Sequence, residues 1–130
     1  MARQIPGTAD EIRGLVPAAL EAYAFTRNHV LTDGVVDGDL KELCFRYLAE
    51  DPETLDLSRF AGREQAALEW AHAIAWDASL ADDALWERLH ALFTEPELVE
   101  LGCAIGFELG QQHWRRTVGL TPRDPEPRAE

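Results

Sequence analysis

Apolar residues recur every three or four positions along most of this chain, and the longest such run spans residues 94–117. At about 100° per residue, this spacing places apolar side chains on one side of an α-helix. The run has two apolar stripes, the first formed by Leu98, Leu101, Ile105 and Leu109 and the second by Cys103, Phe107 and Trp114. One stripe can be buried against its own chain. The second needs another helix, a ligand or another subunit to cover it.

The same run contains a predicted start and a row of small residues. Thr94 followed three residues later by Glu97 forms a capping box, which predicts the N-terminus of the helix. Gly102, Gly106 and Gly110 repeat every four residues. Each glycine costs about 1 kcal/mol relative to alanine in a helix. We therefore expect that a neighbouring backbone packs closely along this row and offsets the cost.

Similar patterns predict helices along the rest of the chain. A capping box at Thr8 and Glu11 precedes a short helix, and further helices are expected over residues 17–32, from Asp37 or Asp39 to residue 50, over 63–77 and over 84–93. The helical pattern breaks over residues 51–62, and 121–130 should be a disordered tail because it has three prolines and no apolar period. Alternation typical of strands is absent. The sequence therefore predicts an all-α fold, a compact bundle of five to six helices in one domain, residues 1–120.

Composition narrows the possible partners. The 130 residues are 46% hydrophobic, which suits a single buried core. Twelve basic and 24 acidic residues give a formal charge of −12, which would repel nucleic-acid phosphates and anionic lipid. The apolar run is interrupted by Glu100 and Glu108 and is shorter than the roughly 20 residues that a bilayer span needs. Neither nucleic acid nor a membrane is expected as a partner.

Two cysteines, Cys44 and Cys103, lie within apolar helical patterns and form no pairing framework. We interpret them as buried free thiols in a reducing compartment. The N-terminal sequence MARQIPGTADEIRG lacks the apolar core of a signal peptide, so a cytoplasmic location is expected.

Glu42 and Arg46 lie four residues apart on one predicted helix. Such pairs are usually surface ion pairs worth a few tenths of a kcal/mol. If Phe45 on the same flank is buried, however, Glu42 would be partly desolvated and could transfer protons. The sequence leaves both interpretations open.

Two histidines are further candidates for proton transfer. His72 shares one side of the 63–77 helix with Glu69 and Trp76, and this side could line a pocket, form a subunit contact or be an amphipathic outer surface. His113 lies on the glycine side of the 94–117 helix, near Arg116, where we expect it to be partly buried. It is either a satisfied core histidine or a second proton carrier.

Metal and cofactor motifs are weak. Glu69-x-x-His72 and Glu87-x-x-His90 have the spacing of ligands in di-iron bundles, but they are consecutive, whereas such bundles alternate them with single glutamates. There is no glycine-rich phosphate loop and no nucleophile elbow. No metal and no cofactor is expected.

Three segments of the chain resemble the carboxymuconolactone decarboxylase and alkylhydroperoxidase D-like superfamily. They are DLKELCFRYLAED, GREQAALEWAHAI and LWERLHALFTEPELVELGCAIGFELGQQHWRRTVGL, which cover most of residues 37–120. The last segment carries an aromatic residue, an acidic cap and the pattern ELVELxxxIG. This resemblance implies a small all-helical protein that forms homo-oligomers, which would cover the second apolar stripe.

The resemblance also implies a reaction class. The redox branch has a helix glutamate followed by Cys-x-x-Cys and a histidine. Glu42 matches the glutamate, but DPETLDLSRF stands where the cysteines would be, so thiol-dependent peroxide reduction is disfavoured.

The decarboxylase branch needs no cysteine. It implies a cofactor-independent lyase or proton-transfer enzyme acting on a small organic acid between helices. Glu42 would be the acid or base, His113 or His72 a second proton carrier, and Arg46 and Trp76 would bind substrate. The alternative is a non-catalytic helical oligomer or ligand-binding protein.

Overall fold

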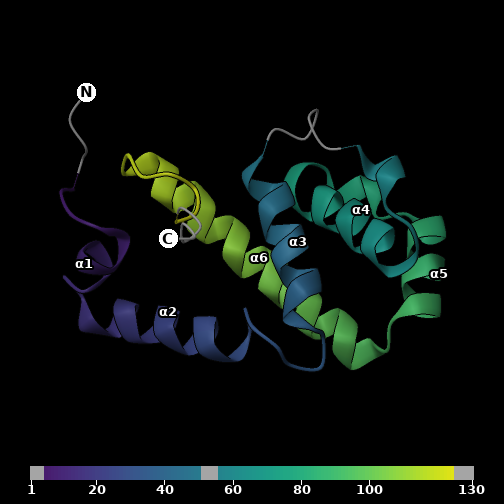
Figure 1. Ribbon diagram of the computed structural model, residues 1–130, viewed down its shortest axis with the longest axis horizontal. Coiled ribbons are helices and arrows are strands. Elements are labelled where there is room, and N and C mark those ends of the chain that lie inside the picture. The colour runs from purple at the N-terminus through teal and green to yellow at the C-terminus, as the bar shows by residue number, and fades with distance from the viewer. Residues whose placement is uncertain (1–4, 51–55, 125–130) are drawn as a thin grey trace, which may run out of the picture.

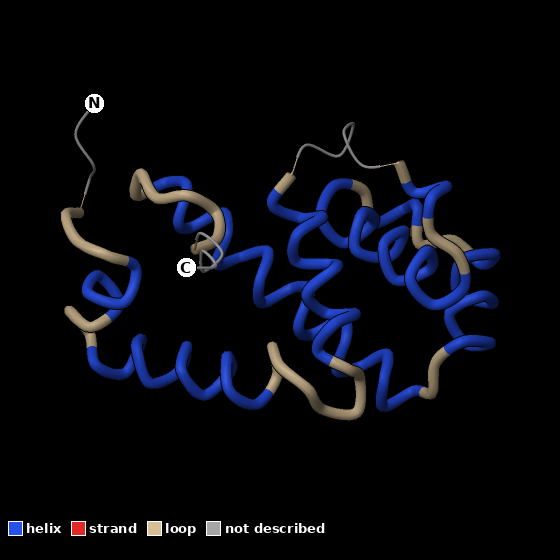
Figure 2. Tube along the Cα trace, viewed as in Figure 1, coloured by secondary structure: helices blue, strands red, loops and turns tan. Residues whose placement is uncertain are grey.

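The helix α6, Glu95–Thr117, runs along the molecule, and the other helices lie beside it or beside its neighbours (Figure 1). The computed structural model describes residues 5–50 and 56–124, and all regular elements in this part are helical, as predicted (Figure 2). The helices preceding α6 are α1 (Ala9–Arg13), α2 (Pro17–His29), α3 (Gly38–Ala49), α4 (Gly62–Trp76) and α5 (Asp83–Leu92), with short 3-10 turns at Leu57–Arg59 and Ala78–Leu80.

Side-chain caps start four of these helices, α1, α3, α5 and α6, close to where the sequence predicts. The capping box of α6 is present: the Thr94 hydroxyl accepts the Glu97 amide at 3.3 Å, and the Glu97 carboxylate accepts the Thr94 amide at 2.8 Å. Thr8 caps α1 in the same way. Asp37 and Asp82 cap α3 and α5. These local interactions explain why the predicted starts are accurate.

The core lies between α3, α4, α5 and α6. In α6 the first apolar stripe faces this core, with Leu98, Leu101 and Ile105 buried and Leu109 partly buried. The other three helices supply the remaining core side chains, which include Leu40, Cys44, Leu48, Ala67, Leu68, Ala71, Leu85 and Leu89. The bundle prediction is confirmed.

The second stripe of α6 is partly covered by the chain itself. Helices α1 and α2, which we call the N-terminal arm, lie along the C-terminal half of α6 (Figure 1). Phe107 stacks on Tyr23 of α2 with ring centroids 6.1 Å apart, and Trp114 lies 5.1 Å from the guanidinium of Arg13 in α1. Both α6 side chains remain partly exposed.

The arm ends earlier than expected, and a buried lysine gives the reason. Helix α2 stops at His29, where the sequence predicts Thr32. The ammonium group of Lys41 is completely buried and donates hydrogen bonds to the carbonyls of Val30 and Thr32 at 2.8 and 2.7 Å. It also pairs with Glu100 at 2.9 Å. These carbonyls therefore accept hydrogen bonds from the Lys41 ammonium group instead of from the backbone amides of a longer helix.

The glycine row differs from expectation. A Cβ at Gly102 would lie 2.8 Å from the Trp70 ring, so this glycine does permit close packing, but with a side chain. At Gly106 and Gly110, no atom lies within 4 Å of the Cβ position. Cys103, on the same side of α6, is exposed, whereas Cys44 is buried. Within this single chain, no described element covers this side, so the predicted burial of Cys103 is wrong and close packing along Gly106 and Gly110 stays a prediction for a neighbouring copy.

The start of the expected tail is held against the bundle. Arg115 donates from Nε to the Thr121 carbonyl at 2.9 Å and pairs with Asp124 at 2.7 Å. Residues 121–124 therefore pack beside α6. Residues 125–130, like 51–55, lie outside the described part of the chain.

Candidate functional site

A cleft separates the N-terminal arm from α6. It consists of three adjoining hollows of about 400, 110 and 390 Å³, and Tyr23 lines all three. Arg13 and Gln111 line the first two, while Glu108 and Arg123 line the second and third. The hollows therefore adjoin one another, and we refer to them together as the cleft, with an apolar end and a polar end.

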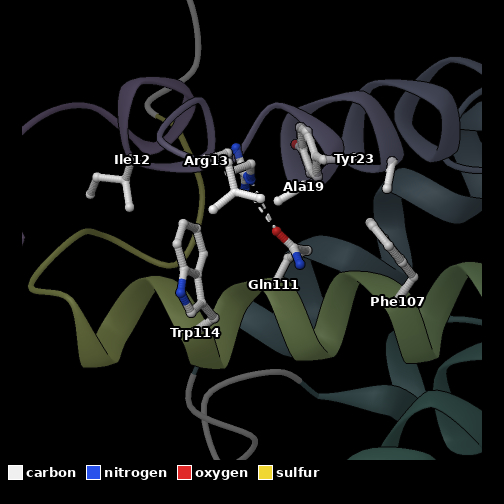
Figure 3. A pocket seen from close by; sticks show the side chains of 9 residues that line it. Ile12, Arg13, Ala19, Tyr23, Phe107, Gln111 and Trp114 are labelled. Atoms are coloured by element: carbon white, nitrogen blue, oxygen red, sulfur yellow. Dashed lines mark hydrogen bonds between the residues drawn. The ribbon is translucent and has the colours of Figure 1, made fainter.

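The apolar end lies between α1, α2 and the C-terminal half of α6. Figure 3 shows Phe107, Gln111 and Trp114 pointing from α6 toward Ile12, Arg13, Ala19 and Tyr23 on the arm. Its volume of about 400 Å³ lies within the range of roughly 300–1,000 Å³ typical of small-molecule pockets. This end can therefore hold a compact apolar group.

Arg13 stands at the inner edge of that hollow and is almost completely buried. Its Nε and Nη2 atoms donate to the Gln111 side-chain oxygen at 3.2 and 2.9 Å, and Nη1 pairs with Asp10 at 2.9 Å. The guanidinium also lies 3.5 Å from the centre of the Tyr23 ring, which is a cation–π contact. Arg13 therefore fixes the arm to α6, and all three of its side-chain nitrogens already donate hydrogen bonds.

The polar end carries two carboxyl groups and one shared arginine. Arg123 lies 2.6 Å from Glu42 through Nη2 and 3.5 Å from Glu108 through Nε. Glu42 comes from α3 and Glu108 from α6, so the site depends on the packing of these two helices. Both carboxyl groups line the hollow of about 390 Å³.

Glu108 is the more deeply buried carboxyl, with 9% of its surface exposed. Burial raises the pKa of Glu108, and the neighbouring Glu42 carboxylate adds to the rise, although the Gln112 hydrogen bond and the charge of Arg123 oppose it. The Gln112 amide is completely buried and donates to Glu108 at 2.8 Å and to the Phe45 carbonyl at 3.0 Å. Glu108 is thus held in place and biased toward its protonated form.

Arg27 is a cation at the polar end without a close carboxylate. Its ion-pair partner is Asp10 at 3.8 Å, and its side chain is about half exposed. It lines the same hollow as Glu42 and Glu108. A carboxylate ligand could therefore approach Arg27 without first displacing a short ion pair.

No protein-family model matches this chain, and no curated protein or solved structure is significantly similar to it. The cleft must therefore be interpreted from its own chemistry.

Of the five catalytic or substrate-binding residues that the sequence predicts, Glu42 is the one that lines this cleft. Phe45 beside it is buried, which is the condition under which Glu42 could serve in proton transfer. The expected ion pair with Arg46 does not form. Arg46 is exposed, and its side chain makes no ion pair or hydrogen bond within the described residues.

His72 and Trp76 come together elsewhere, on the face between α3 and α4. His72 Nδ1 lies 2.6 Å from the Tyr47 hydroxyl, and the Trp76 ring centroid lies 5.0 Å from that of His72 and 5.7 Å from that of Tyr47. Tyr47 and Glu42 project about 140° apart around α3, because they are five residues apart on a helix. This aromatic cluster is therefore separate from the carboxyl pair.

His113 is exposed, contrary to the prediction of partial burial. It lies on the side of α6 where Gly106 and Gly110 have no neighbour, so no described residue encloses it. Among the described residues, no group of three or more His, Cys, Asp or Glu side chains is arranged to hold a metal ion. None of the described helices is both long and apolar enough to cross a bilayer.

Proposed function

We propose that the protein binds a small oxo acid at the polar end of the cleft and transfers protons with Glu108 and Glu42. The observation that carries the proposal is a buried carboxyl with a raised pKa, Glu108, facing a cavity beside a second carboxyl that stays half exposed and is paired with Arg123. Carboxyl groups in different environments are the usual basis for a division into acid and base. This refines the cofactor-independent lyase or proton-transfer chemistry that the superfamily resemblance implies.

The Glu108 proton can serve in two reactions, an enolisation and a decarboxylation. In an enolisation, the Glu42 carboxylate removes a proton from the carbon next to the ketone, and the Glu108 carboxyl gives its proton to the ketone oxygen. In a decarboxylation of a 3-oxo acid, the C–C bond breaks, carbon dioxide leaves, and the bonding electron pair forms the enol whose oxygen takes the Glu108 proton. Neither reaction needs a co-reactant, and neither uses His72 or His113.

Arg27 replaces Arg46 as the proposed carboxylate anchor. A guanidinium can bind a carboxylate with two parallel hydrogen bonds. Arg27 lines the hollow that contains both glutamates, whereas Arg46 points to solvent. Substituting Arg27→Gln should weaken binding of oxo acids, and substituting Arg46→Gln should not.

Exchange of carbon-bound hydrogen tests the chemistry. The purified protein is incubated with 2-oxobutanoate or 2-oxooctanoate in D₂O, and loss of the C3 proton signal is followed by NMR. Decarboxylation of 3-oxobutanoate is measured in parallel. We expect catalysis by the wild type and a loss of about 10²- to 10⁴-fold in Glu108→Gln, the usual contribution of a general acid or base. Glu87→Gln, an exposed carboxyl on α5, is the matched control. Wild-type rates equal to the buffer rate, or an unchanged rate in Glu108→Gln, would refute the proposal.

A non-catalytic binding protein is the second candidate. The contact of Arg123 with both carboxyl groups favours it, because a guanidinium held there stabilises their ionised forms and occupies part of the polar hollow. This candidate predicts binding of the acids by calorimetry without exchange or decarboxylation. A thiol-dependent peroxidase is disfavoured further, because burial raises the pKa of Cys44 to about 12, so its thiolate is scarce.

Self-association and a cytoplasmic location are part of the proposal. Large apolar side chains of the arm and its flanks are exposed, among them Leu15, Val16, Phe25 and Val35. Exposed apolar groups of this kind are commonly covered by a second subunit. The two free cysteines are consistent with a reducing compartment.

A further inference from the structure

We propose that the cleft selects monocarboxylic acids that carry an apolar tail, with the carboxylate at Arg27 and the tail in the hollow between the arm and Phe107 and Trp114. This inference rests on the proposed function for the position of the acid, and it extends that function to a substrate class.

The two ends of the cleft differ in chemistry. The apolar hollow is lined by aliphatic and aromatic groups, and its polar side chains, Arg13 and Gln111, bind each other. The hollow of about 390 Å³ contains Arg27 and Arg123 together with Glu42 and Glu108. Arg123 already pairs with both carboxyl groups, so Arg27 is the cation that can take a ligand carboxylate. A molecule that fits both ends must therefore be charged at one end and apolar at the other.

The middle hollow is the smallest of the three and shares lining residues with both ends. Its volume is about 110 Å³, and Tyr23 lines it as well as the two larger hollows. A tail that leaves the polar end must therefore pass Tyr23 before it reaches Ala19 and Trp114. Because this hollow is small, we expect a linear chain to fit better than a group that is branched beside the carboxylate.

Helix geometry sets the length of the ligand. Ala19 and Arg27 are eight residues apart on α2, which corresponds to about 12 Å along the helix axis. Butanoate is too short to span this distance, whereas octanoate and decanoate can reach into the apolar hollow. Each methylene that becomes buried should raise the affinity about fourfold.

Calorimetric titration with butanoate, hexanoate, octanoate and decanoate, each below its micelle concentration, tests the proposal. We expect the affinity of the wild type to rise about fourfold per added methylene, and the indole N–H signal of Trp114 to shift in NMR spectra only with the longer acids. Octanol should bind at least tenfold more weakly than octanoate because it lacks the carboxylate. Equal affinity for all four acids, or equal affinity for octanol and octanoate, would overturn the inference.

Two variants on neighbouring positions of α2 locate the tail. Ala19 lines the apolar hollow, and Ala18 lines none of the three hollows of the cleft, although both residues are exposed and tolerate a larger side chain. Ala19→Trp should fill the hollow and remove the dependence on chain length, while Ala18→Trp should keep it. If the affinity rises equally with chain length in both variants, the acids adsorb elsewhere on the surface, and the inference would be wrong.

The binding experiment is independent of turnover. Glu108→Gln should keep the dependence on chain length while losing proton exchange, because Glu108 is not part of the apolar hollow. Chain-length dependence without any exchange in the wild type would refute the proposed function alone. Exchange without chain-length dependence would refute the tail site alone.

Discussion

A single buried carboxyl sets the chemical character of the cleft. Glu108 lies in the helix face that packs against the core, yet it borders a cavity and touches Arg123. Its raised pKa has a thermodynamic consequence as well as a chemical one, because a group that holds its proton more tightly when folded links stability to pH.

We expect Glu108→Gln to gain stability relative to the wild type as pH rises. Below the ordinary carboxyl range, Glu108 is protonated in both the folded and unfolded states, so it contributes no pH dependence. As pH rises, the unfolded state releases its proton first, because the pKa of Glu108 is raised in the folded state. The free energy of unfolding of the wild type therefore falls, relative to Glu108→Gln, as pH rises from the ordinary carboxyl pKa through the raised value.

Urea denaturation of both proteins between about pH 4 and pH 8 measures this difference, since that interval spans the ordinary carboxyl pKa and values above it. Glu87→Gln serves as the control, because Glu87 is exposed. A stability difference between Glu108→Gln and the wild type that stays constant with pH would contradict the assignment of a raised pKa.

Lys41 is the chain's single lysine, and it is completely buried. Its three donors are all used, by the Val30 and Thr32 carbonyls and by Glu100. The lysine thus joins the end of the arm to both α3 and α6. Replacing it leaves two carbonyls and a carboxylate without their shared cation.

We therefore expect Lys41→Met to lower the free energy of unfolding by about 3–5 kcal/mol, the usual cost of removing one partner of a buried pair. Arg88→Met is the comparison. Its pair with Glu69 is more than one third exposed on both sides and should be worth about 0–1 kcal/mol. Denaturant unfolding of both variants gives the two values, and similar losses would show that Lys41 is not critical.

At the level of the helices, the sequence predicts what local chemistry determines. Capping residues locate the start of α6 to within one residue, and the apolar spacing identifies its core stripe. The buried face of α6 in fact continues with the same three-and-four spacing through Glu108, Gln112 and Arg115. The carboxyl of Glu108 and the amide of Gln112 thus occupy core positions of this pattern. They point to a functional site, but a search for apolar residues alone overlooks them.

The remaining site residues depend on tertiary contacts that no local pattern encodes. Arg123 follows the last helix in a proline-rich segment, yet it reaches back to Glu42, 81 positions earlier in the chain. Glu42 pairs with it because α3 turns that carboxyl toward α6, while Arg46 on the next turn points to solvent. Spacing along one helix therefore predicted the wrong partner for a residue that does line the cleft.

The glycines of α6 test which side of the helix is covered. Gly106→Ala and Gly110→Ala should each stabilise the protomer by about 1 kcal/mol, because alanine favours the helix and no atom lies within 4 Å of the added Cβ. Gly102→Ala should instead destabilise it, since the Cβ would lie 2.8 Å from the Trp70 ring.

Denaturation at low protein concentration measures the free energy of unfolding of the protomer, and sedimentation at high concentration measures self-association. If copies of the chain pack along Gly106 and Gly110, the alanine variants will associate more weakly even though each protomer is more stable. Destabilisation of the dilute protein by either substitution would contradict the open geometry at these positions.

At the scale of the whole molecule, the chain divides into a tightly packed half and a lightly attached arm. Six residues of α4 are buried, whereas none of α2 is. The arm is held by a few specific contacts, chiefly Arg13 with Gln111 and Lys41 with the carbonyls that follow α2. The arm forms one wall of the cleft, so we expect the cleft to widen when the arm opens.

We expect amide hydrogens of α2 to exchange on the order of 10²-fold faster than those of α4, since helices with few buried contacts open locally without global unfolding. Decanoate should slow exchange in α2 and leave α4 unchanged, because a ligand in the cleft contacts both the arm and α6. Mass spectrometry of exchanged peptides, with Lys41→Met as a variant that loosens the arm, measures both effects.

If α2 exchanges as slowly as α4 in dilute protein, the arm is not lightly attached. Slow exchange that disappears on dilution would instead show that a second copy covers the exposed side of α2, where Phe25 is 62% exposed.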